Sequence, residues 1–199
     1  LYGEKSLPVL LRKLCKISGL RWIRVLYCYP EEITDELIRV MKEEPQICNY
    51  LDLPIQHAND DILKRMGRKT SKQDLIDIVG KLRQAIPDIC VRTTLLTGFP
   101  GETQEQYEEL YRFVSEMEFD RLGVFTYSPE EDTPAALMLD QIEESVKEER
   151  QAELMELQQE IAFEAAENMV GKEVLVMIEG NVADENVYVG RTYKDAPNI

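Results

Sequence analysis

The sequence alternates regularly between helical and strand-like patterns, and this alternation constrains its fold more than any other feature. Strand-like runs of β-branched and aromatic residues occur at 21–29, 50–53, 89–97 and 121–127. Helical runs, in which apolar residues recur every three or four positions, occur at 6–18, 32–44, 59–66, 71–86 and 103–117. We therefore predict an α/β fold of about four βα units, with a parallel sheet and right-handed crossovers. Four strands could form a small open sheet or part of a barrel, and the pattern alone does not decide between them.

The C-terminal third of the sequence has a different character. Residues 141–170 hold nine glutamates against Lys147 and Arg150, which predicts a long, acidic, amphipathic helix. Its apolar stripe consists of Leu154, Leu157, Ile161 and Ala165. Strands are then predicted at 172–178 and 187–189, with a turn at 183–186. The last 29 residues are too few for an independent sheet domain, so we expect this small all-β unit to be cut short.

The net charge of the chain is -15, from 38 acidic and 23 basic side chains, and it is unevenly distributed. Residues 1–100 carry a net charge of +3, whereas residues 101–199 carry -18. Neutralising phosphates needs clustered Lys and Arg, so a chain this acidic is a poor stand-alone binder of nucleic acid. No apolar run approaches the roughly 18 residues of a membrane span, and the start of the chain does not resemble a signal peptide, so we expect no membrane association.

The cysteines and the histidine limit the metal chemistry that the sequence predicts. Cys15, Cys28, Cys48 and Cys90 are separated by 12, 19 and 41 residues, which is not the paired spacing of a zinc site or an iron–sulfur motif. Buried thiols in a reducing, cytoplasmic environment are the simpler interpretation. His57 is the only histidine, which excludes a His-rich metal site, so we expect no metal ligands in this sequence.

Three of the predicted strands end in residues that could carry chemistry, and in α/β folds ligands gather at the carboxyl ends of strands. These residues are Gln56 and His57, then Arg92, Thr94, Thr97, Gly98 and Gly101, and finally Tyr127 and Ser128. Each has a simpler interpretation as well: a lone histidine is often a core hydrogen-bonding group, a Gly-Phe-Pro-Gly segment is often a turn, and Thr103 is a typical helix cap. Their joint placement at successive strand ends favours a ligand site.

Residues 63–69 form a basic patch in an acidic protein. The cations Arg65, Arg68 and Lys69 follow a predicted helix, and positive charge is favourable near a helix C-terminus. A solvated helix end is one interpretation of this patch. A site for an anionic ligand group, such as a carboxylate, is the other.

Three segments taken together resemble the radical-SAM methylthiotransferase family. They are Leu53-Pro-Ile-Gln-His57, Leu63-Lys-Arg-Met66 with Arg68, and Arg92-Thr-Thr-Leu-Leu-Thr-Gly-Phe-Pro-Gly-Glu-Thr103. The segment 119–135 is similar to the RimO branch, which modifies an aspartate of small-subunit ribosomal protein number twelve. The tRNA-modifying branch, MiaB, usually has a basic residue and a different apolar pattern there. The resemblance covers essentially the whole chain, including the acidic helix and the first strands of a TRAM-like domain.

The resemblance implies a partial TIM-like barrel in residues 1–138, an acidic linker helix in 139–170 and a truncated TRAM-like β domain in 171–199. In the family, a C-x-x-x-C-x-x-C motif holds a [4Fe-4S] cluster, S-adenosylmethionine binds its open iron, and the resulting radical abstracts hydrogen from the substrate. An N-terminal domain with a second [4Fe-4S] cluster supplies sulfur, and another S-adenosylmethionine supplies the methyl group. This sequence contains no such motif, so its strands would be barrel strands three to six of a fragment that we expect to be inactive alone.

The resemblance also implies roles for individual residues. Those expected to contact S-adenosylmethionine are Gln56, His57, Arg92, Thr94, Thr97, Gly98, Gly101, Tyr127 and Ser128. Those expected to serve the substrate are Arg65, Arg68 and Lys69. Arg92 and Thr94 would point into the barrel, and the two glycines would bring backbone groups close to the cofactor.

Three functions are compatible with the sequence. The first is methylthiolation of an aspartate on a ribosomal protein, whose basic surface suits an acidic recognition arm. The second is methylthiolation of tRNA, against which the charge of -18 in residues 101–199 argues. The third is a non-catalytic module that holds a basic partner on its acidic helix. An opened barrel also exposes unpaired strand edges, through which the fragment could dimerise.

Overall fold

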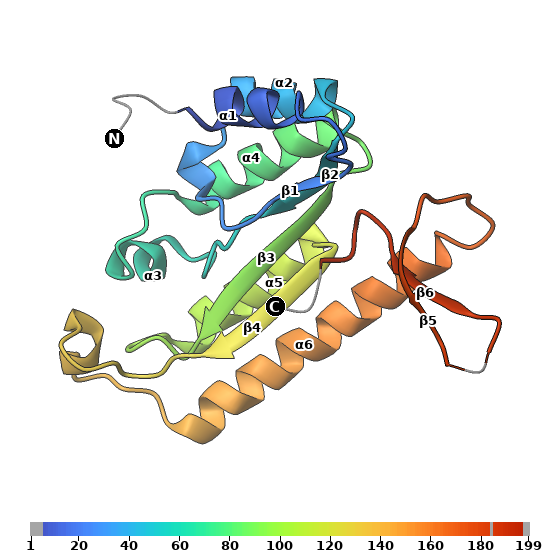
Figure 1. The fold of residues 1–199 in the computed structure, drawn as a ribbon. Coiled ribbons are helices and arrows are strands. Elements are labelled where there is room, and N and C mark those ends of the chain that lie inside the picture. Colours follow the sequence, from blue (N-terminus) through green and yellow to red (C-terminus); the bar gives the residue numbers. More distant parts are fainter. Residues whose placement is uncertain (1–5, 184, 197–199) are drawn as a thin grey trace.

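The computed structural model describes residues 6–183 and 185–196. Four parallel strands form its main sheet in the order β1-β2-β3-β4 (Figure 1). They are β1 (Ile23–Val25), β2 (Ile47–Asp52), β3 (Cys90–Thr97) and β4 (Arg121–Thr126). Because the spatial order follows the chain order, every crossover steps in the same direction, and right-handed crossovers then leave the connecting helices on one face. A βα barrel is wound in this way, and the predicted α/β fold with four parallel strands is confirmed.

The helices lie in the segments predicted to be helical, mostly with shorter ends. The α-helices of the described residues are α1 (Leu7–Leu14), α2 (Asp35–Glu43), α3 (Asp60–Arg65), α4 (Lys72–Ala85), α5 (Gln104–Met117) and α6 (Glu144–Glu167). Short 3-10 helices occur at Pro30–Glu32 and Pro134–Leu137. Ser71 and Thr103 each form a capping box, with Asp74 and Gln106 respectively, and thereby define where α4 and α5 begin.

The two faces of the sheet differ in polarity, as β3 shows. Val91, Thr93 and Leu95 are buried on one face, whereas Arg92 and Thr94 on the other face are only half-buried. This alternation is the two-residue period of a strand. All six α-helices contribute apolar side chains to the core on the buried side, most of them from α2, α4 and α5. The main hydrophobic core therefore lies between sheet and helices. The opposite, open face carries polar groups such as Arg92 and Thr94, besides a small apolar cluster around Tyr50 and Cys90.

The first strand is shorter than the pattern predicts. Residues 21–29 were expected to be extended, but β1 ends at Val25 and the chain turns, with Tyr27 at a φ of 58°. The backbone N–H of Tyr27 donates to Asp52 Oδ2 over 3.2 Å, and that of Cys28 donates to the Asp52 carbonyl over 2.9 Å. The aromatic residues after β1 thus surround the end of the sheet instead of lengthening the strand.

Helix α6 is the predicted acidic helix, and it runs along β4 (Figure 1). Its inner side is more polar than expected, because Leu154 is the one fully buried residue of the predicted apolar stripe. The other buried side chains of α6 are Lys147, Arg150 and Gln158. Gln151 Nε2 donates to the Val124 carbonyl of β4 over 2.6 Å. Within the described residues, no helix is long and apolar enough to cross a membrane.

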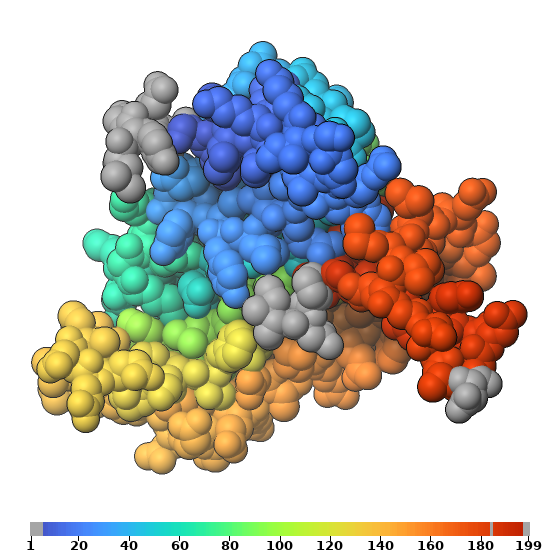
Figure 2. Space-filling model, viewed as in Figure 1, coloured from blue at the N-terminus to red at the C-terminus, as the bar shows by residue number. Residues whose placement is uncertain are grey.

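A two-stranded antiparallel hairpin follows α6 and forms a separate lobe at one side of the molecule (Figure 2). Its strands are β5 (Met177–Asn181) and β6 (Tyr188–Arg191), so the first begins five residues later than predicted. The predicted turn at 183–186 includes residue 184, which lies outside the described residues. After β6 the chain returns to the open face of the sheet, where Tyr193 packs beside Tyr50 and Cys90. The division into three domains inferred from the sequence stays a prediction.

Candidate functional site

A cavity of about 420 Å³ lies at the carboxyl end of the sheet, on its open face. It is lined by Tyr27, Cys28, Tyr29, Pro54, Gln56, Arg68, Arg92, Thr94 and Phe125. Segments at the ends of all four strands, together with the loop after α3, contribute these residues. The carboxyl end of a parallel sheet is where ligands bind in such folds. Four residues to which the resemblance assigned a role, Gln56, Arg68, Arg92 and Thr94, therefore lie together at this edge.

Arg92 and Thr94 reach the cavity because they alternate along β3 with residues that face the core. Arg92 Nη1 lies 3.3 Å from Asp52 Oδ2, and the arginine side chain keeps 34% of its surface exposed. The cavity adjoins a larger hollow of about 1060 Å³, with which it shares Tyr27, Arg92 and Phe125. The guanidinium of Arg92 thus stands between two spaces that are open to a ligand.

Two residues of the cavity wall have a backbone conformation that side chains other than glycine rarely adopt. Gln56 has a φ of 73° and Tyr27 has a φ of 58°. Gln56 is held there by β3, since its N–H donates to the Thr94 carbonyl over 2.9 Å and its carbonyl accepts from the Leu96 N–H over 2.8 Å. Such strained residues cluster at ligand sites, where the surrounding structure holds them in place.

The other cavity residues are aromatic, cationic or uncharged. Burial, followed by the nearby charges of Asp52 and Glu32, raises the pKa of the Cys28 thiol to about 11, so this thiol is protonated at neutral pH. The guanidinium of Arg68 lies 5.2 Å from the centre of the Tyr29 ring and donates to the Pro54 carbonyl. The cavity therefore offers cations and ring faces to a ligand, without a thiolate nucleophile.

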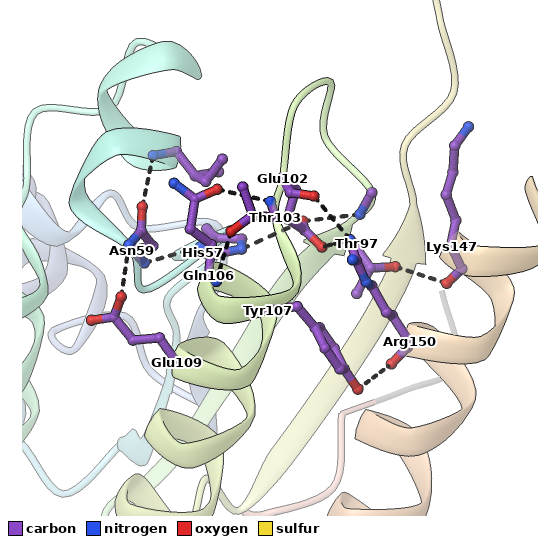
Figure 3. A network of polar contacts seen from close by, with 12 residues as sticks. His57, Asn59, Thr97, Glu102, Thr103, Gln106, Tyr107, Glu109, Lys147 and Arg150 are labelled. Carbon is purple, nitrogen blue, oxygen red and sulfur yellow. Dashed lines mark hydrogen bonds and ion pairs between the residues drawn. The ribbon is translucent and has the colours of Figure 1, made fainter. Parts of the chain in front are cut away.

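His57 lies apart from the cavity, in the buried polar network of Figure 3. Its Nδ1 accepts from the backbone N–H of Asn59 over 2.9 Å, and its Nε2 lies 3.5 Å from Glu102 Oε2. Glu102 also accepts from the Gly98 N–H over 3.0 Å and from Arg150 Nη1 over 2.7 Å. His57 thus occupies the role of a core hydrogen-bonding group, and Glu102 joins the loop after β3 to helix α6.

The glycine loop is packed against other side chains of the protein. A Cβ on Gly98 would lie 2.2 Å from Lys147 Cγ, and one on Gly101 would lie 2.6 Å from Arg65 Nη1. The N–H of Gly98 binds Glu102, and that of Gly101 donates to the Asp140 carbonyl over 2.6 Å. The close approach that was expected for a cofactor is therefore made here by Lys147 and Arg65.

The remaining predicted residues surround these two groups. Thr97 is buried, and its hydroxyl donates to the Lys147 carbonyl over 3.2 Å. Tyr127 is buried edge-on against Phe99, with 5.5 Å between ring centres. Ser128, Arg65 and Lys69 are exposed, and none of the three lines the cavity.

Sequence reasoning did not single out Asp52, Tyr27 or Phe125. Asp52 was included in a predicted strand, and a charge in a buried strand is a signal that could have marked it. The two aromatic residues were counted as ordinary strand formers. Their position at the cavity follows from the turn after β1 and from the alternation along β4, which the pattern does not resolve.

The residues present do not fit an iron–sulfur cluster. Among residues 6–183 and 185–196, no group of three or more His, Cys, Asp or Glu side chains could hold a metal ion. The four cysteines are buried, at the end of α1, after β1, and in β2 and β3. Burial raises the pKa of each of these thiols.

Known proteins share both the sequence and the fold of this chain. Residues 3–114 match the Radical SAM superfamily. The chain is 64% identical over 199 residues to the ribosomal protein uS12 methylthiotransferase RimO of Lachnoclostridium phytofermentans and 51% identical to that of Alkaliphilus oremlandii. Both alignments cover 100% of this chain and 45% of the relative, so the chain spans just under half the length of these relatives.

Among solved structures, coproporphyrinogen III oxidase (HemN) of Escherichia coli, a radical SAM enzyme, superposes with a TM-score of 0.58 and 21% identity. The match covers 85% of this chain and 39% of HemN. Elp3 of Methanocaldococcus infernus superposes with a TM-score of 0.52 and 18% identity, over 69% of this chain and 32% of Elp3. At these identities the likeness concerns the fold alone. Since the superfamily match extends over more than half of the chain and agrees with its parallel sheet, the chain belongs to the Radical SAM superfamily.

Proposed function

We propose that this chain is the cofactor-binding part of an S-adenosylmethionine-dependent enzyme that adds a methylthio group to an aspartate of ribosomal protein uS12. The observation that carries the proposal is the 64% identity, over the whole chain, to a uS12 methylthiotransferase. The chain covers 45% of that relative, so the activity proposed is that of the full-length protein. We infer that the reaction takes place in the cytoplasm, because the proposed substrate is a ribosomal protein.

The cavity fits the chemistry of S-adenosylmethionine. This cofactor presents a carboxylate, an ammonium, a sulfonium, a ribose and an adenine. Arg92 provides a guanidinium for the carboxylate, Gln56 and Thr94 provide an amide and a hydroxyl, and Phe125 and Tyr27 provide ring faces. When bound, the cofactor would supply the radical that abstracts hydrogen from the substrate, and a further molecule of it would supply the methyl group.

The other predicted residues support the cavity in this proposal. Thr97, Gly98, His57 and Tyr127 keep the loop after β3 in place through Glu102 and Lys147. Gly101 and Ser128 belong to the same edge of the sheet. Arg65, Arg68 and Lys69 lie at the end of α3 and in the loop after it, and we propose that they face the protein substrate. We place both [4Fe-4S] clusters of the full-length enzyme on residues other than those described, and we assign no step to them.

Charge supports a ribosomal protein as the partner. The glutamates of α6 that lie away from the sheet are exposed, among them Glu148, Glu149 and Glu160, and residues 101–199 carry a charge of -18. Proteins that bind ribosomal RNA are basic, so a long acidic helix would steer one towards the site. Raising the salt concentration from 0.05 to 0.5 M should therefore weaken binding of uS12 by about tenfold or more. Equal binding, measured by calorimetry at both concentrations, would contradict the steering role.

The proposed reaction is tested with the full-length protein and reconstituted clusters. Incubation with S-adenosylmethionine and uS12 should add one methylthio group to the ribosomal protein, detected by mass spectrometry. A mass increase confined to tRNA would assign the protein to tRNA modification instead. Tight binding of uS12 without any binding of S-adenosylmethionine would identify a non-catalytic module.

A further inference from the structure

Asp52 is a buried acid that contacts the lining of the candidate site. It ends β2, has no exposed surface, and touches two residues that line the cavity, Tyr27 and Arg92. Its Oδ2 accepts from the strained residue Tyr27 and lies 3.3 Å from Arg92 Nη1. Its Oδ1 is buried without a hydrogen-bond partner among the described residues. A buried carboxylate that is only partly satisfied is costly, which points to a role other than stability.

Arg92 is the charged side chain that pairs with the Asp52 carboxylate. Its side chain comes from the neighbouring strand β3 and is one-third exposed towards the cavity. Within the described part of the chain, two arginines line the cavity, and no acidic side chain does. The cavity therefore accepts an anionic group, and a guanidinium binds a carboxylate through several parallel donors.

We propose that Asp52 is a positioning residue that holds the Arg92 guanidinium ready to bind a ligand carboxylate. The pairing uses one nitrogen of Arg92 and leaves the other donors available. It also fixes the long side chain before a ligand arrives, so that less freedom is lost on binding. Asp52 also accepts a hydrogen bond from the N–H of Tyr27, so it holds two of the residues that line the cavity, Tyr27 and Arg92. The inference rests on the proposed function for the identity of the ligand.

Two carboxylates are available to this site: that of S-adenosylmethionine and that of the aspartate to be modified. The experiment uses the full-length reconstituted protein and its Asp52→Asn variant, which keeps the shape and an acceptor for Tyr27 but removes the charge. Calorimetry gives the Kd for S-adenosylmethionine, and product formation at saturating cofactor gives the KM for uS12. We expect one of the two constants to rise about tenfold, and the one that rises identifies the ligand.

A double-mutant cycle separates positioning from a general structural role. If Asp52 acts through Arg92, Asp52→Asn changes nothing further in an Arg92→Met background. An independent structural role would instead give additive losses, and this result would overturn the proposal. Unchanged or tighter binding by the Asp52→Asn variant would overturn it as well. Should that variant fail to fold, the double variant is compared with Arg92→Met alone: equal constants support the proposal, and unequal ones refute it.

Asp120 provides a matched control. Its carboxylate also accepts from a backbone N–H, that of Val91, over 3.0 Å, and it pairs with Lys194 over 3.2 Å. It lies just before β4, at the amino end of the sheet. Asp120→Asn should leave both constants within about twofold of the wild type. If the wild type formed no product on uS12, the proposed function would fail. Calorimetry with S-adenosylmethionine and with uS12 in turn would then still show whether Asp52→Asn weakens binding of either ligand, and unchanged binding of both would overturn the role of Asp52.

Discussion

Replacing Gly98 by alanine should destabilise the protein far more than the same change at Gly67. Both glycines have left-handed backbone conformations, with φ values of 72° and 73°. An alanine in this conformation costs about 1–2 kcal/mol. At Gly67 nothing lies within 4 Å of the new Cβ, so this cost is the whole effect. At Gly98 the Cβ would overlap the buried stem of Lys147, at 2.2 Å from Cγ and 2.9 Å from Cδ.

Lys147 has no simple way to move aside. It is 4% exposed, and its ammonium donates to the Tyr127 carbonyl over 2.9 Å. Losing a hydrogen bond from a buried charged group costs about 1.5–3 kcal/mol, which brings the loss for Gly98→Ala to about 2.5–5 kcal/mol. Gly101→Ala meets the end of the exposed side chain of Arg65, which can swing away, so it should resemble Gly67→Ala.

The assay is urea denaturation followed by the fluorescence of Trp22, the single tryptophan of the chain. The free energies of unfolding of the Gly67→Ala and Gly98→Ala variants should differ by about 1.5–3 kcal/mol. Adding Lys147→Ala to Gly98→Ala removes the overlap and should recover part of that difference. Equal losses of unfolding free energy at Gly67 and Gly98 would refute the argument that contact with Lys147 is the reason why position 98 requires glycine.

Two further predictions concern buried ionisable groups. Glu102→Gln leaves Arg150 buried without its charged partner, so the free energy of unfolding should fall by about 3–5 kcal/mol, and a melting temperature equal to that of the wild type would contradict this. Burial raises the pKa of Cys28 from 9.0 to about 11 and that of Cys90 to about 12. Because the unfolded thiols ionise first, the stability that these residues contribute is complete below pH 9 and is lost as pH rises towards 11–12. Denaturation curves at pH 8 and pH 10.5 should show a loss that serine variants at both positions reduce, and identical curves for variant and wild type would rule the thiols out.

The sequence predicted the order of helices and strands, and it singled out the edge of the sheet at which the candidate cavity lies. Strand β3 illustrates why: its alternation of polar and apolar residues places Arg92 and Thr94 on the face opposite Val91 and Leu95. Such alternation is local, so it can be read along one segment of chain. Gln56 was singled out because it follows a strand, and it lines the cavity; its contact with a cofactor stays a prediction.

The sequence did not predict the contacts between segments that lie far apart in the chain. His57 follows Gln56 directly, yet the turn at Gln56 sends the imidazole away from the cavity towards Glu102, which lies 45 positions later in the chain. Lys147 and Arg150 were interpreted as minor basic residues of an acidic helix, whereas they are its buried anchors. Pairings over such separations depend on how α6 lies along β4, and no periodic pattern encodes that placement.

The position of α6 also determines how many neighbours the main sheet could acquire. Gln151 already donates to the Val124 carbonyl of β4, so that side of the sheet is occupied, and among the described residues β1 is left as its open edge. A sheet with one open edge can pair with one other sheet. Two copies that pair through β1 therefore leave no free edge of the main sheet for a third copy. Pairing of this kind closes into a twofold dimer and cannot propagate into a fibre.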